Sequence, residues 1–483
     1  MTRAVKAAPD VRHVVSINDL TNGEIETVFE VAQQFLDELP DPNFPYRIGR
    51  NTDIAAPYIL GTLFYEPSTR TRLSFESAML RLGGRIITSA DPATSSAAKG
   101  ESLADSVRVV ANYADIMVLR HPRDGAARLA AEYSPIPIVN GGDGSHEHPT
   151  QTLCDIFTIR KRNKTLKNLS VAISGDLKGS RTIHSFVYAL ARFNANILMM
   201  PAKGMELPPH VDSRLREEFH CVTVPKEKYG ADNQAIDALY ITPEEPHQLS
   251  LIPGSELDDD ASMKIWKTIH AVYVTRFQKE RWAEKDQSYP RIDAHFLSGP
   301  EYSRTSVLHP LPRVGELDAA LDMDARAVYF EQAAHGVPIR MALLSLLLGL
   351  HPKKSLARFA GGFVPGDRPL YDQPLSLGAR CANANCISHD PMESQSVRNR
   401  FFLAGTQDAP KARCFYCESD LQGFVIADRK RGHFTTDASS LGRLSNGQMK
   451  EAIIFRDAEE AHAAGFALKE DGRRGGTKRR AHG

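Results

Sequence analysis

The stretch Phe64–Gly84, FYEPSTRTRLSFESAMLRLGG, decides the fold, because it carries the chain from a buried strand into a helix. The apolar run 58–64 predicts the strand, and apolar residues at helical spacing predict a helix over 72–82. Three hydroxyls and two arginines crowd into Ser68–Arg72, where the helix begins. Backbone amides at a helix start attract anions, and a guanidinium binds phosphate bidentately. We therefore predict a phosphate site; the alternative is that Ser68 only caps the helix and the arginines are solvated.

Composition narrows the class of protein. The 483 residues are 42% hydrophobic and 24% charged, which is ordinary for a globular protein and leaves room for three domains. Lysine plus arginine equals aspartate plus glutamate at 59 each, so no net field favours nucleic acid or a membrane as partner. The most apolar run, Met341–Leu350, is about half a membrane span, and residues 1–20 lack the apolar core of a signal peptide. We expect a cytoplasmic protein.

Short apolar strands alternate with helical segments from Tyr58 onward, and a second such unit begins near residue 165. This alternation predicts an α/β fold with two doubly wound parallel-sheet domains, which bind ligands at the carboxyl ends of their strands. The helices are expected over 72–82, 101–113 and 125–133. The strands are expected over 58–64, 85–89, 115–119, 136–139, 171–176, 197–200, 221–224, 238–241, 271–275 and 306–309.

Polar side chains follow the strands of the first unit. Arg120 comes directly after an apolar run, so it is expected to point into the crevice at the strand ends. His148 and Gln151 share one face at the start of a helix that follows a glycine-rich turn; the alternative for His148 is a structural role. The polar loop 91–101 offers Ser95 and Lys99, which otherwise belong to a mobile surface loop.

The second unit offers a carboxylate-binding set. Arg181 opens a helix after a strand, while Arg276 and Gln278 lie two apart just past another strand. The two arginines are placed to hold the carboxylates of a dicarboxylic amino acid; the alternative is a solvated charged surface. The glycines before Arg181 match neither G-x-G-x-x-G nor G-x-x-x-x-G-K-[ST], which argues against a nucleotide site.

The cysteines gather near the C-terminus. Cys381-x4-Cys386 and Cys414-x2-Cys417 form two close pairs, while the other two cysteines of the chain are isolated. In a cytosolic chain such pairs indicate a metal site rather than disulfides, and four thiolates suit a closed, structural, tetrahedral Zn²⁺. The alternative is four unrelated thiols. We expect no cofactor for catalysis.

Several of these motifs carry a family resemblance. Ser68-Thr69-Arg70-Thr71 resembles the carbamoyl-phosphate signature of aspartate and ornithine carbamoyltransferases, and the block from His148 to Gln151 resembles the segment that contacts the carbamoyl group. The segment 175–185, GDLKGSRTIHS, resembles the aspartate-binding segment. His309-Pro310-Leu311-Pro312-Arg313 is of the aspartate type, because ornithine enzymes have a cysteine after that histidine. The resemblance covers residues 13–350.

The C-terminal cysteines resemble a different chain of the same enzyme. CANANCISHD at 381–390 and ARCFYCESD at 412–420 are similar to the zinc domain of the aspartate carbamoyltransferase regulatory chain, here fused to the catalytic chain. The stretch 351–380 is too short for the nucleotide-binding domain that precedes the zinc domain in regulatory chains. The resemblance therefore implies that the zinc module serves assembly.

The resemblance implies transfer of the carbamoyl group of carbamoyl phosphate to L-aspartate, an early step of pyrimidine biosynthesis, by a homotrimer or a multiple of it. The implied catalytic residues are Arg70, Thr71, Arg120 and His148. The implied carbamoyl-phosphate ligands are Ser68, Thr69, Arg70, Thr71, Arg120, His148, Gln151 and Leu311. The implied aspartate ligands are Lys99, Arg181, Arg276, Gln278 and Pro312, with Ser95 and Lys99 arriving from a neighbouring subunit.

The predicted domain order follows from these motifs: a carbamoyl-phosphate domain at 1–150 on which 325–352 packs back, an aspartate domain at 151–324, a linker at 353–380, a small zinc-binding β domain at 381–430, and an extension at 431–483 with a basic, disordered tail. An insertion near 240–270 departs from the family pattern and favours the alternative of an inactive scaffold or assembly subunit. A further alternative is transfer to another amine such as ornithine, which the arginines disfavour because they repel a cation.

Overall fold

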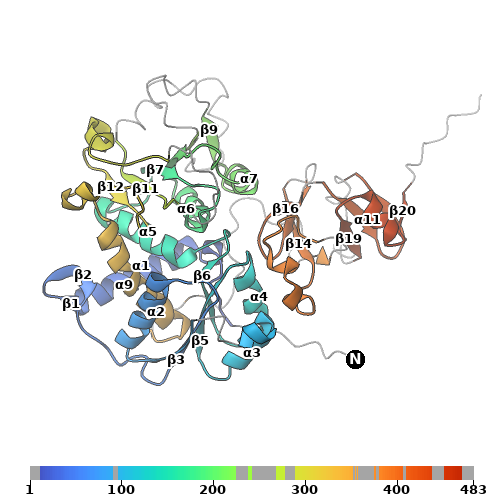
Figure 1. The fold of residues 1–483 in the computed structure, drawn as a ribbon, viewed down its shortest axis with the longest axis horizontal. Helices are drawn as coiled ribbons and strands as arrows, with labels where there is room; N and C mark the ends of the chain where they lie inside the picture. The colour runs from blue at the N-terminus through green and yellow to red at the C-terminus, as the bar shows by residue number, and fades with distance from the viewer. Residues whose placement is uncertain are drawn as a thin grey trace, which may run out of the picture. The chain divides into compact units, whose positions relative to one another are not determined.

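The computed structural model describes residues 11–90, 96–224, 238–241, 268–277, 289–351, 354, 356, 375–376, 380–405, 410–421, 423–437 and 451–469. The chain divides into two compact units. The larger comprises residues 1–366 together with 385–397, and the smaller comprises 367–384 and 398–483. Figure 1 shows the elements of both.

The first sheet of the larger unit has four parallel strands in the order β4-β3-β5-β6. Its strands are β3 (Ile59–Phe64), β4 (Arg85–Ser89), β5 (Ile116–His121) and β6 (Ile138–Asp143). The helices that connect and follow them are α2 (Thr69–Arg81), α3 (Leu103–Val110), α4 (Ala126–Tyr133) and α5 (Pro149–Asn163). The predicted alternation of strands and helices is confirmed here: a helix lies in each crossover between consecutive parallel strands.

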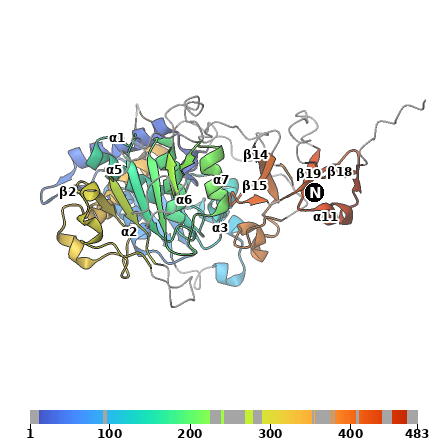
Figure 2. The ribbon, with the colours of Figure 1, turned by 90° about the horizontal axis from the view of Figure 1, so that it is seen from above.

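The second sheet has six strands in the order β12-β11-β7-β8-β10-β9. Its strands are β7 (Ser170–Gly175), β8 (Asn196–Pro201), β9 (Val222–Val224), β10 (Ala238–Ile241), β11 (Ala271–Val274) and β12 (Ser306–Leu308), with helices α6 (Arg181–Arg192) and α7 (Pro209–Glu217) (Figure 2). The predicted parallel sheet is confirmed for β12, β11, β7 and β8, whereas β10 runs antiparallel to both β8 and β9. The insertion predicted at 240–270 begins within β10, and residues 242–267 lie outside the described part.

A long apolar helix joins the two sheets. Helix α9 (Tyr329–Leu347) packs against α2, α5 and α1 (Asn22–Glu38), which is followed by the short strands β1 (Pro40–Asp41) and β2 (Phe44–Ile48). A helix that is apolar on most of its faces must be buried, and one continuous apolar core runs from α1 through α9 to the second sheet. The sheets are thereby held at a fixed separation, with their strand ends around a common space.

Residues 385–397 dock on the first sheet's helices. The backbone of Asp124, just before α4, exchanges hydrogen bonds with this segment, including one of 3.1 Å from its N–H to the Asn385 carbonyl. The Asn385 amide also donates to the Asp124 carboxylate over 2.9 Å. The buried Glu393 carboxylate accepts from the Leu103 N–H, at the first turn of α3. Residues 385–397 therefore belong to the larger unit, although residues 367–384 of the smaller unit precede them in the sequence.

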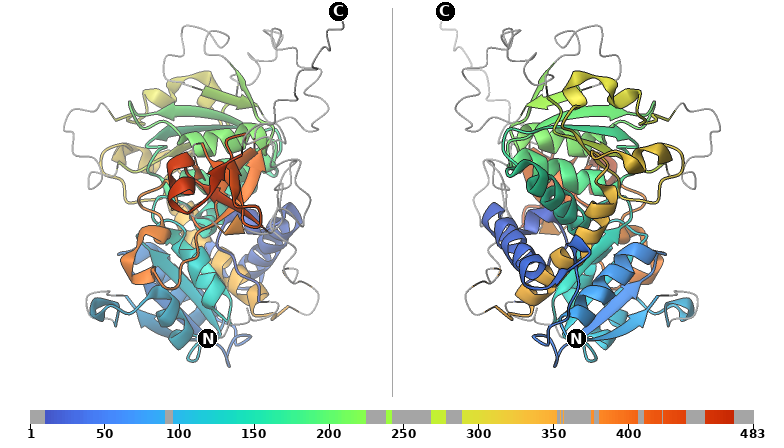
Figure 3. Two further views of the ribbon diagram at one scale, coloured as in Figure 1. Left: turned by 90° about the vertical axis from the view of Figure 1, so that its right-hand side faces the viewer. Right: turned by 90° about the vertical axis from the view of Figure 1, so that its left-hand side faces the viewer.

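The smaller unit consists of two antiparallel-rich sheets, drawn in orange and red in Figure 3. The first holds β13 (Leu375–Ser376), β14 (Arg400–Gly405), β15 (Pro410–Cys414) and β16 (Asp420–Leu421). The second holds β17 (Val425–Asp428), β18 (His433–Thr435), β19 (Ala452–Phe455) and β20 (Ala467–Leu468), with α11 (Ala458–Ala463) and an apolar cluster of its own. Among the described residues, no helix has the length and apolarity that a membrane crossing requires.

Arg192 on α6 secures the N-terminal segment and yields a stability prediction. Its buried guanidinium donates to the Ile17 carbonyl and the Asn22 side chain over 3.0 Å each, and also to the Leu20 carbonyl. Arg192→Ala should lower the free energy of unfolding by about 2–4 kcal/mol, because buried carbonyls lose their donors. Urea denaturation measures this loss. The control Arg291→Ala removes an exposed ion pair with Asp318 and should change it by about 0.5 kcal/mol. Equal effects of the two substitutions would contradict the assignment.

Candidate active site

A cavity of about 860 Å³ opens where the carboxyl ends of both sheets face the start of α9. Both sheets and α9 supply its lining, so it exists only in the folded larger unit. The lining residues are Glu66, Pro67, Ser68, Thr69, Arg70, Thr71, Leu73, Ser74, Ser77, Arg120, His148, Gln151, Cys154, Gly179, Ser180, Arg181, Thr182, Arg276, His309, Pro310, Leu311, Pro312, Gln332, Ala333, Gly336, Val337 and Arg340.

The N-terminus of α2 forms one wall. Ser68 is the N-cap residue in an extended conformation, but its side chain accepts no capping hydrogen bond, so the interpretation of Ser68 as a mere cap is not supported. The first amides of a helix have no intrahelical partner and here belong to a segment that lines the cavity. Thr71 is buried, and Arg70 donates to the carbonyl of Leu311 over 2.6 Å. This wall is built to accept an anion.

Positive charge dominates the cavity. Glu66 is the one acidic residue among the lining residues, which include five arginines. One oxygen of Glu66 accepts from Arg181 over 2.7 Å and lies 3.4 Å from Nη2 of Arg120. Burial, together with the charge of nearby Arg276, lowers the pKa of Arg70. An arrangement in which cations lower each other's pKa binds a multiply charged anion strongly.

His148 is held as a neutral donor. It is the N-cap of α5, where its Nδ1 accepts from the Gln151 N–H over 3.4 Å. This leaves the proton on Nε2, which lies 3.4 Å from the Thr71 hydroxyl. Burial is the largest cause of a pKa well below the usual histidine value, and the charges of Arg120 and Arg340 lower it further. An imidazole in this state can donate to a substrate oxygen without carrying charge.

The loop after β12 is fixed by a buried pair. His309 Nε2 lies 2.8 Å from Glu316, and its Nδ1 accepts from the Leu311 N–H over 2.8 Å. Leu311 has a φ of 54°, which is unfavourable for a side chain with a Cβ. The histidine therefore stabilises the backbone conformation that directs the Leu311 carbonyl toward Arg70.

The residues predicted from sequence are brought together to different degrees. The predicted residues that line the cavity are Ser68, Thr69, Arg70, Thr71, Arg120, His148, Gln151, Arg181, Arg276, Leu311 and Pro312. Lys99, at the end of the short helix Ser96–Lys99, is exposed and does not line the cavity of its own chain. Ser95 and Gln278 lie outside the described residues.

Sequence reasoning missed several polar residues of the site and its surroundings, among them Glu66, Asp155, Gln332 and Arg340. Glu66 lies in the turn that carries the predicted phosphate motif, and no sequence pattern indicates that a carboxylate belongs to an anion site. Asp155 lies one helical turn beyond Gln151, which was a usable signal, and its carboxylate accepts from Gln151 over 2.7 Å. Gln332 and Arg340 are on α9, far along the chain, and no local pattern points to them.

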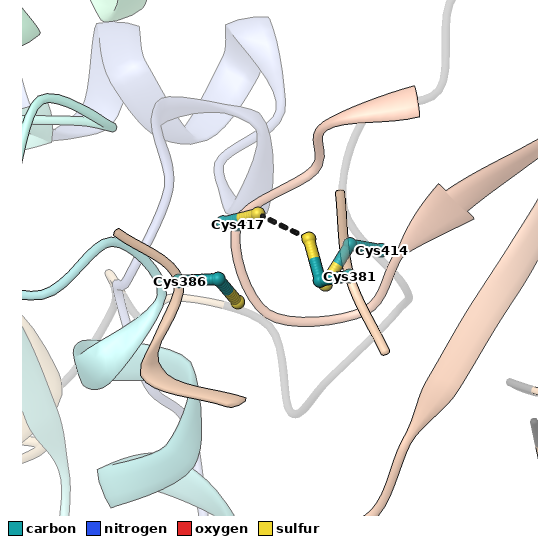
Figure 4. Close-up of side chains that lie close together, drawn as sticks. All are labelled: Cys381, Cys386, Cys414 and Cys417. Atoms are coloured by element: carbon teal, nitrogen blue, oxygen red, sulfur yellow. Dashed lines mark hydrogen bonds between the residues drawn. The ribbon is translucent and has the colours of Figure 1, made fainter. Parts of the chain in front are cut away.

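The four clustered cysteines form a separate candidate metal centre (Figure 4). Cys381, Cys386, Cys414 and Cys417 are buried, and their sulfurs all lie within 4.8 Å of one another. Sulfurs of a tetrahedral zinc site are about 3.8 Å apart, given Zn–S bonds of about 2.3 Å. The donor set and its spacing therefore fit a closed thiolate site.

Comparison with known proteins gives the family. A model of the aspartate/ornithine carbamoyltransferase carbamoyl-P binding domain matches residues 12–161, and one of the Asp/Orn binding domain matches 253–347. The aspartate carbamoyltransferase catalytic subunit of Picrophilus torridus is 39% identical over 340 residues, which span 70% of this chain and 98% of the relative. The chain belongs to the aspartate carbamoyltransferase family.

Solved structures agree with this carbamoyltransferase assignment. The catalytic subunit of M. jannaschii aspartate transcarbamoylase superposes with a TM-score of 0.54 at 38% identity, covering 71% of this chain and all of that one. The Trypanosoma cruzi enzyme in complex with carbamoyl phosphate and aspartate gives 0.55 at 29% identity, covering 70% and 97%. The metal-binding domain of the aspartate carbamoyltransferase regulatory chain matches residues 379–426, which include all four cysteines. The predicted fusion of both chain types is confirmed.

The protonation state of His148 in this carbamoyltransferase can be measured directly. Because burial and neighbouring arginines lower its pKa, its ring should stay neutral with the proton on Nε2 from pH 8 down to pH 5.5. Histidine-selective ¹⁵N labelling, with the His148→Asn variant for assignment, gives the two ring shifts. A ring that titrates between pH 6 and 7 would contradict this geometry.

Proposed function

We propose that the protein transfers the carbamoyl group of carbamoyl phosphate to the amine of L-aspartate, giving N-carbamoyl-L-aspartate and phosphate at an early step of pyrimidine biosynthesis. The observation that carries this proposal is the uncapped start of α2, which presents Ser68–Thr71 to an arginine-lined cavity. Relatives about 40% identical are named aspartate carbamoyltransferase catalytic subunits, which supports the same reaction.

The phosphate binds at the start of α2 in this proposal. Ser68, Thr69 and the helix amides donate to its oxygens, and the Arg70 guanidinium counters the charge that develops on the bridging oxygen. In this structure the Arg70 guanidinium donates to the Leu311 carbonyl. Phosphate departure then needs no general acid, because phosphate is already a good leaving group in a strongly positive site.

The carbonyl oxygen of the carbamoyl group meets preorganised donors. The Thr71 hydroxyl, the Arg120 guanidinium and the Nε2–H of His148 are grouped around it, since His148 already lies against Thr71. As the aspartate amine attacks, negative charge grows on this oxygen, and donors fixed before the reaction stabilise it without reorganisation. A neutral His148 suits this role because it stays a donor across the physiological range.

The aspartate binds on the side of the second sheet. Arg181 and Arg276 hold its two carboxylates beside Pro312, so that the amine faces the carbonyl carbon. Gln278, which lies outside the described residues, is assigned to the same ligand by the family resemblance alone. Lys99 is exposed and away from its own cavity, which supports its delivery with Ser95 into the site of a neighbouring subunit. A site shared in this way favours a homotrimer or a multiple of it.

Two alternatives fit less well. Ornithine would bring a cationic side chain against Arg181 and Arg276, and like charges at that distance are repulsive. An inactive scaffold would not need the buried, oriented His148 or the arginine cluster around Glu66, both of which cost folding free energy. The intact cavity therefore favours catalysis.

The four cysteines hold a structural Zn²⁺ in this proposal. Their thiolates leave no open coordination position, so the metal supplies stability rather than chemistry. The metal-binding domain of the aspartate carbamoyltransferase regulatory chain matches this region, and we assign the module a role in assembly.

The central assignment is tested at Arg70. Arg70→Gln should reduce kcat/KM for N-carbamoyl-aspartate formation by about 10²–10⁴-fold, because the leaving phosphate loses its counter-charge. Arg72→Gln is a matched control on the same turn, since Arg72 pairs with Glu76 and does not line the cavity. Both are assayed with aspartate and with ornithine, and ornithine should give no product. Normal turnover by a folded Arg70→Gln protein would refute the assignment.

The metal proposal makes a separate prediction. The purified protein should contain one Zn²⁺ per chain by elemental analysis, and Cys414→Ser should lose it together with several degrees of thermal stability. Cys221→Ser changes a buried cysteine outside the cluster and should keep the metal. Four thiols that react with a thiol reagent in the untreated protein would speak against a thiolate-bound metal.

A further inference from the structure

We propose that Asp155 is a positioning residue: its carboxylate fixes the orientation of two glutamine amides, so that the site presents hydrogen-bond acceptors to the –NH₂ of the carbamoyl group and selects it over an acyl group. This inference rests on the proposed function, because it concerns the carbamoyl end of the same cavity.

The geometry is a carboxylate with two amide donors. Asp155 is fully buried on α5, and its Oδ1 accepts from Nε2 of Gln151 over 2.7 Å and from Nε2 of Gln332 over 2.6 Å. An ionised carboxylate can only accept hydrogen bonds. Each glutamine must therefore turn its NH₂ toward Asp155 and its carbonyl oxygen away from it.

The orientation of the two amides determines which hydrogen-bond acceptors face the cavity. Gln151 lines the cavity, so turning its NH₂ back leaves its Oε1 as an acceptor in a wall where arginines supply mostly donors. The Oε1 of Gln332 accepts from the His309 N–H over 2.9 Å, at the start of the loop that carries Leu311. The Leu311 carbonyl is a second acceptor on the same cavity. One carboxylate thus orients an amide acceptor directly and a backbone acceptor through a chain of hydrogen bonds.

An acceptor pair discriminates between two nearly identical groups. A carbamoyl group and an acetyl group share the carbonyl and differ in –NH₂ against –CH₃. A buried acceptor that meets a methyl group loses its hydrogen bond without gaining water, which disfavours the acyl compound. If Gln151 flipped, its NH₂ would face the substrate –NH₂ and the preference would vanish; if Gln332 flipped, its NH₂ would face the His309 N–H and the loop that carries the Leu311 acceptor would lose a hydrogen bond.

The charge state of Asp155 is set by its surroundings. Burial raises the pKa of Asp155 to about 7, against the opposing effect of the two amides, the Tyr273 hydroxyl of β11 and the Arg340 charge of α9. Burial also raises the pKa of Cys154 to about 11 and that of Tyr273 well above its usual value, so both keep their protons.

The two nearest histidine rings, those of His148 and His309, stay neutral near neutral pH. The pKa values of His148 and His309 are lowered, in both cases chiefly by burial. Near neutrality Asp155 is therefore the group that changes charge. Once its other oxygen, Oδ2, is protonated, Oδ1 still accepts from both amides, but these hydrogen bonds lose their charge assistance and hold the two orientations less firmly.

The test compares the affinities of carbamoyl phosphate and acetyl phosphate for the full zinc-loaded protein, by short-time competition against a phosphonate inhibitor at pH 8. The wild type should prefer carbamoyl phosphate, and Asp155→Leu, which removes the acceptor of both glutamine amides, should reduce this preference by roughly tenfold, the value of about one buried hydrogen bond. Acetyl phosphate affinity should stay the same, which also shows that the variant is folded. The matched control Thr158→Val changes a buried hydroxyl one turn further along α5 and should keep the preference.

A second readout needs no variant. In the wild type the preference for carbamoyl over acetyl phosphate should fall between pH 8 and pH 6, as Asp155 takes up its proton, and Asp155→Leu should show no such change. A preference that is independent of pH in the wild type, or unchanged in a folded Asp155→Leu protein, overturns the proposal. A failure of the proposed function gives a different result: the protein prefers carbamoyl phosphate in the binding assay but forms no N-carbamoyl-aspartate from aspartate.

Discussion

The repulsion among guanidinium groups around a single carboxylate is the constraint on which the site depends. Arg120 follows β5 and Arg181 opens α6, and both meet one oxygen of Glu66 in the turn before α2. Cations gathered in a partly desolvated cavity repel each other unless an anion is present. The strands, the helices and the continuous core that includes α9 must hold them there, and the cavity binds an anionic ligand because folding has already supplied that energy.

Local patterns were sufficient for most elements and for much of the site. The strand predicted over 85–89 is β4 itself, because short apolar runs between turn residues are a local signal. The same signal could not give the direction of β10, since an apolar run has the same period in parallel and antiparallel pairing. The predicted helix start at 72 was three residues late, because the hydroxyl-rich turn is itself the first turn of α2.

What sequence could not give were partners that lie far apart in the chain. Gln332 reaches Asp155 across 177 positions, and no periodicity reports such a contact. The docking of residues 385–397 before α4 was likewise invisible, because it depends on backbone hydrogen bonds of Asp124. The cysteine spacing, in contrast, was informative because a tetrahedral metal needs pairs of ligands close in sequence.

The buried Asp155 shows that function outweighs stability at one point of this core. Its pKa is raised from the ordinary value to about 7, so the folded state favours the protonated form. Between about pH 4 and pH 7 this carboxyl ionises in the unfolded chain but keeps its proton in the folded protein, so the stability falls as the pH rises, by an amount on the order of 4 kcal/mol. An apolar residue of similar size would remove this cost and would leave both glutamine amides without a fixed orientation. A destabilising carboxylate directly behind the cavity is therefore better explained by the need to orient substrate contacts than by packing.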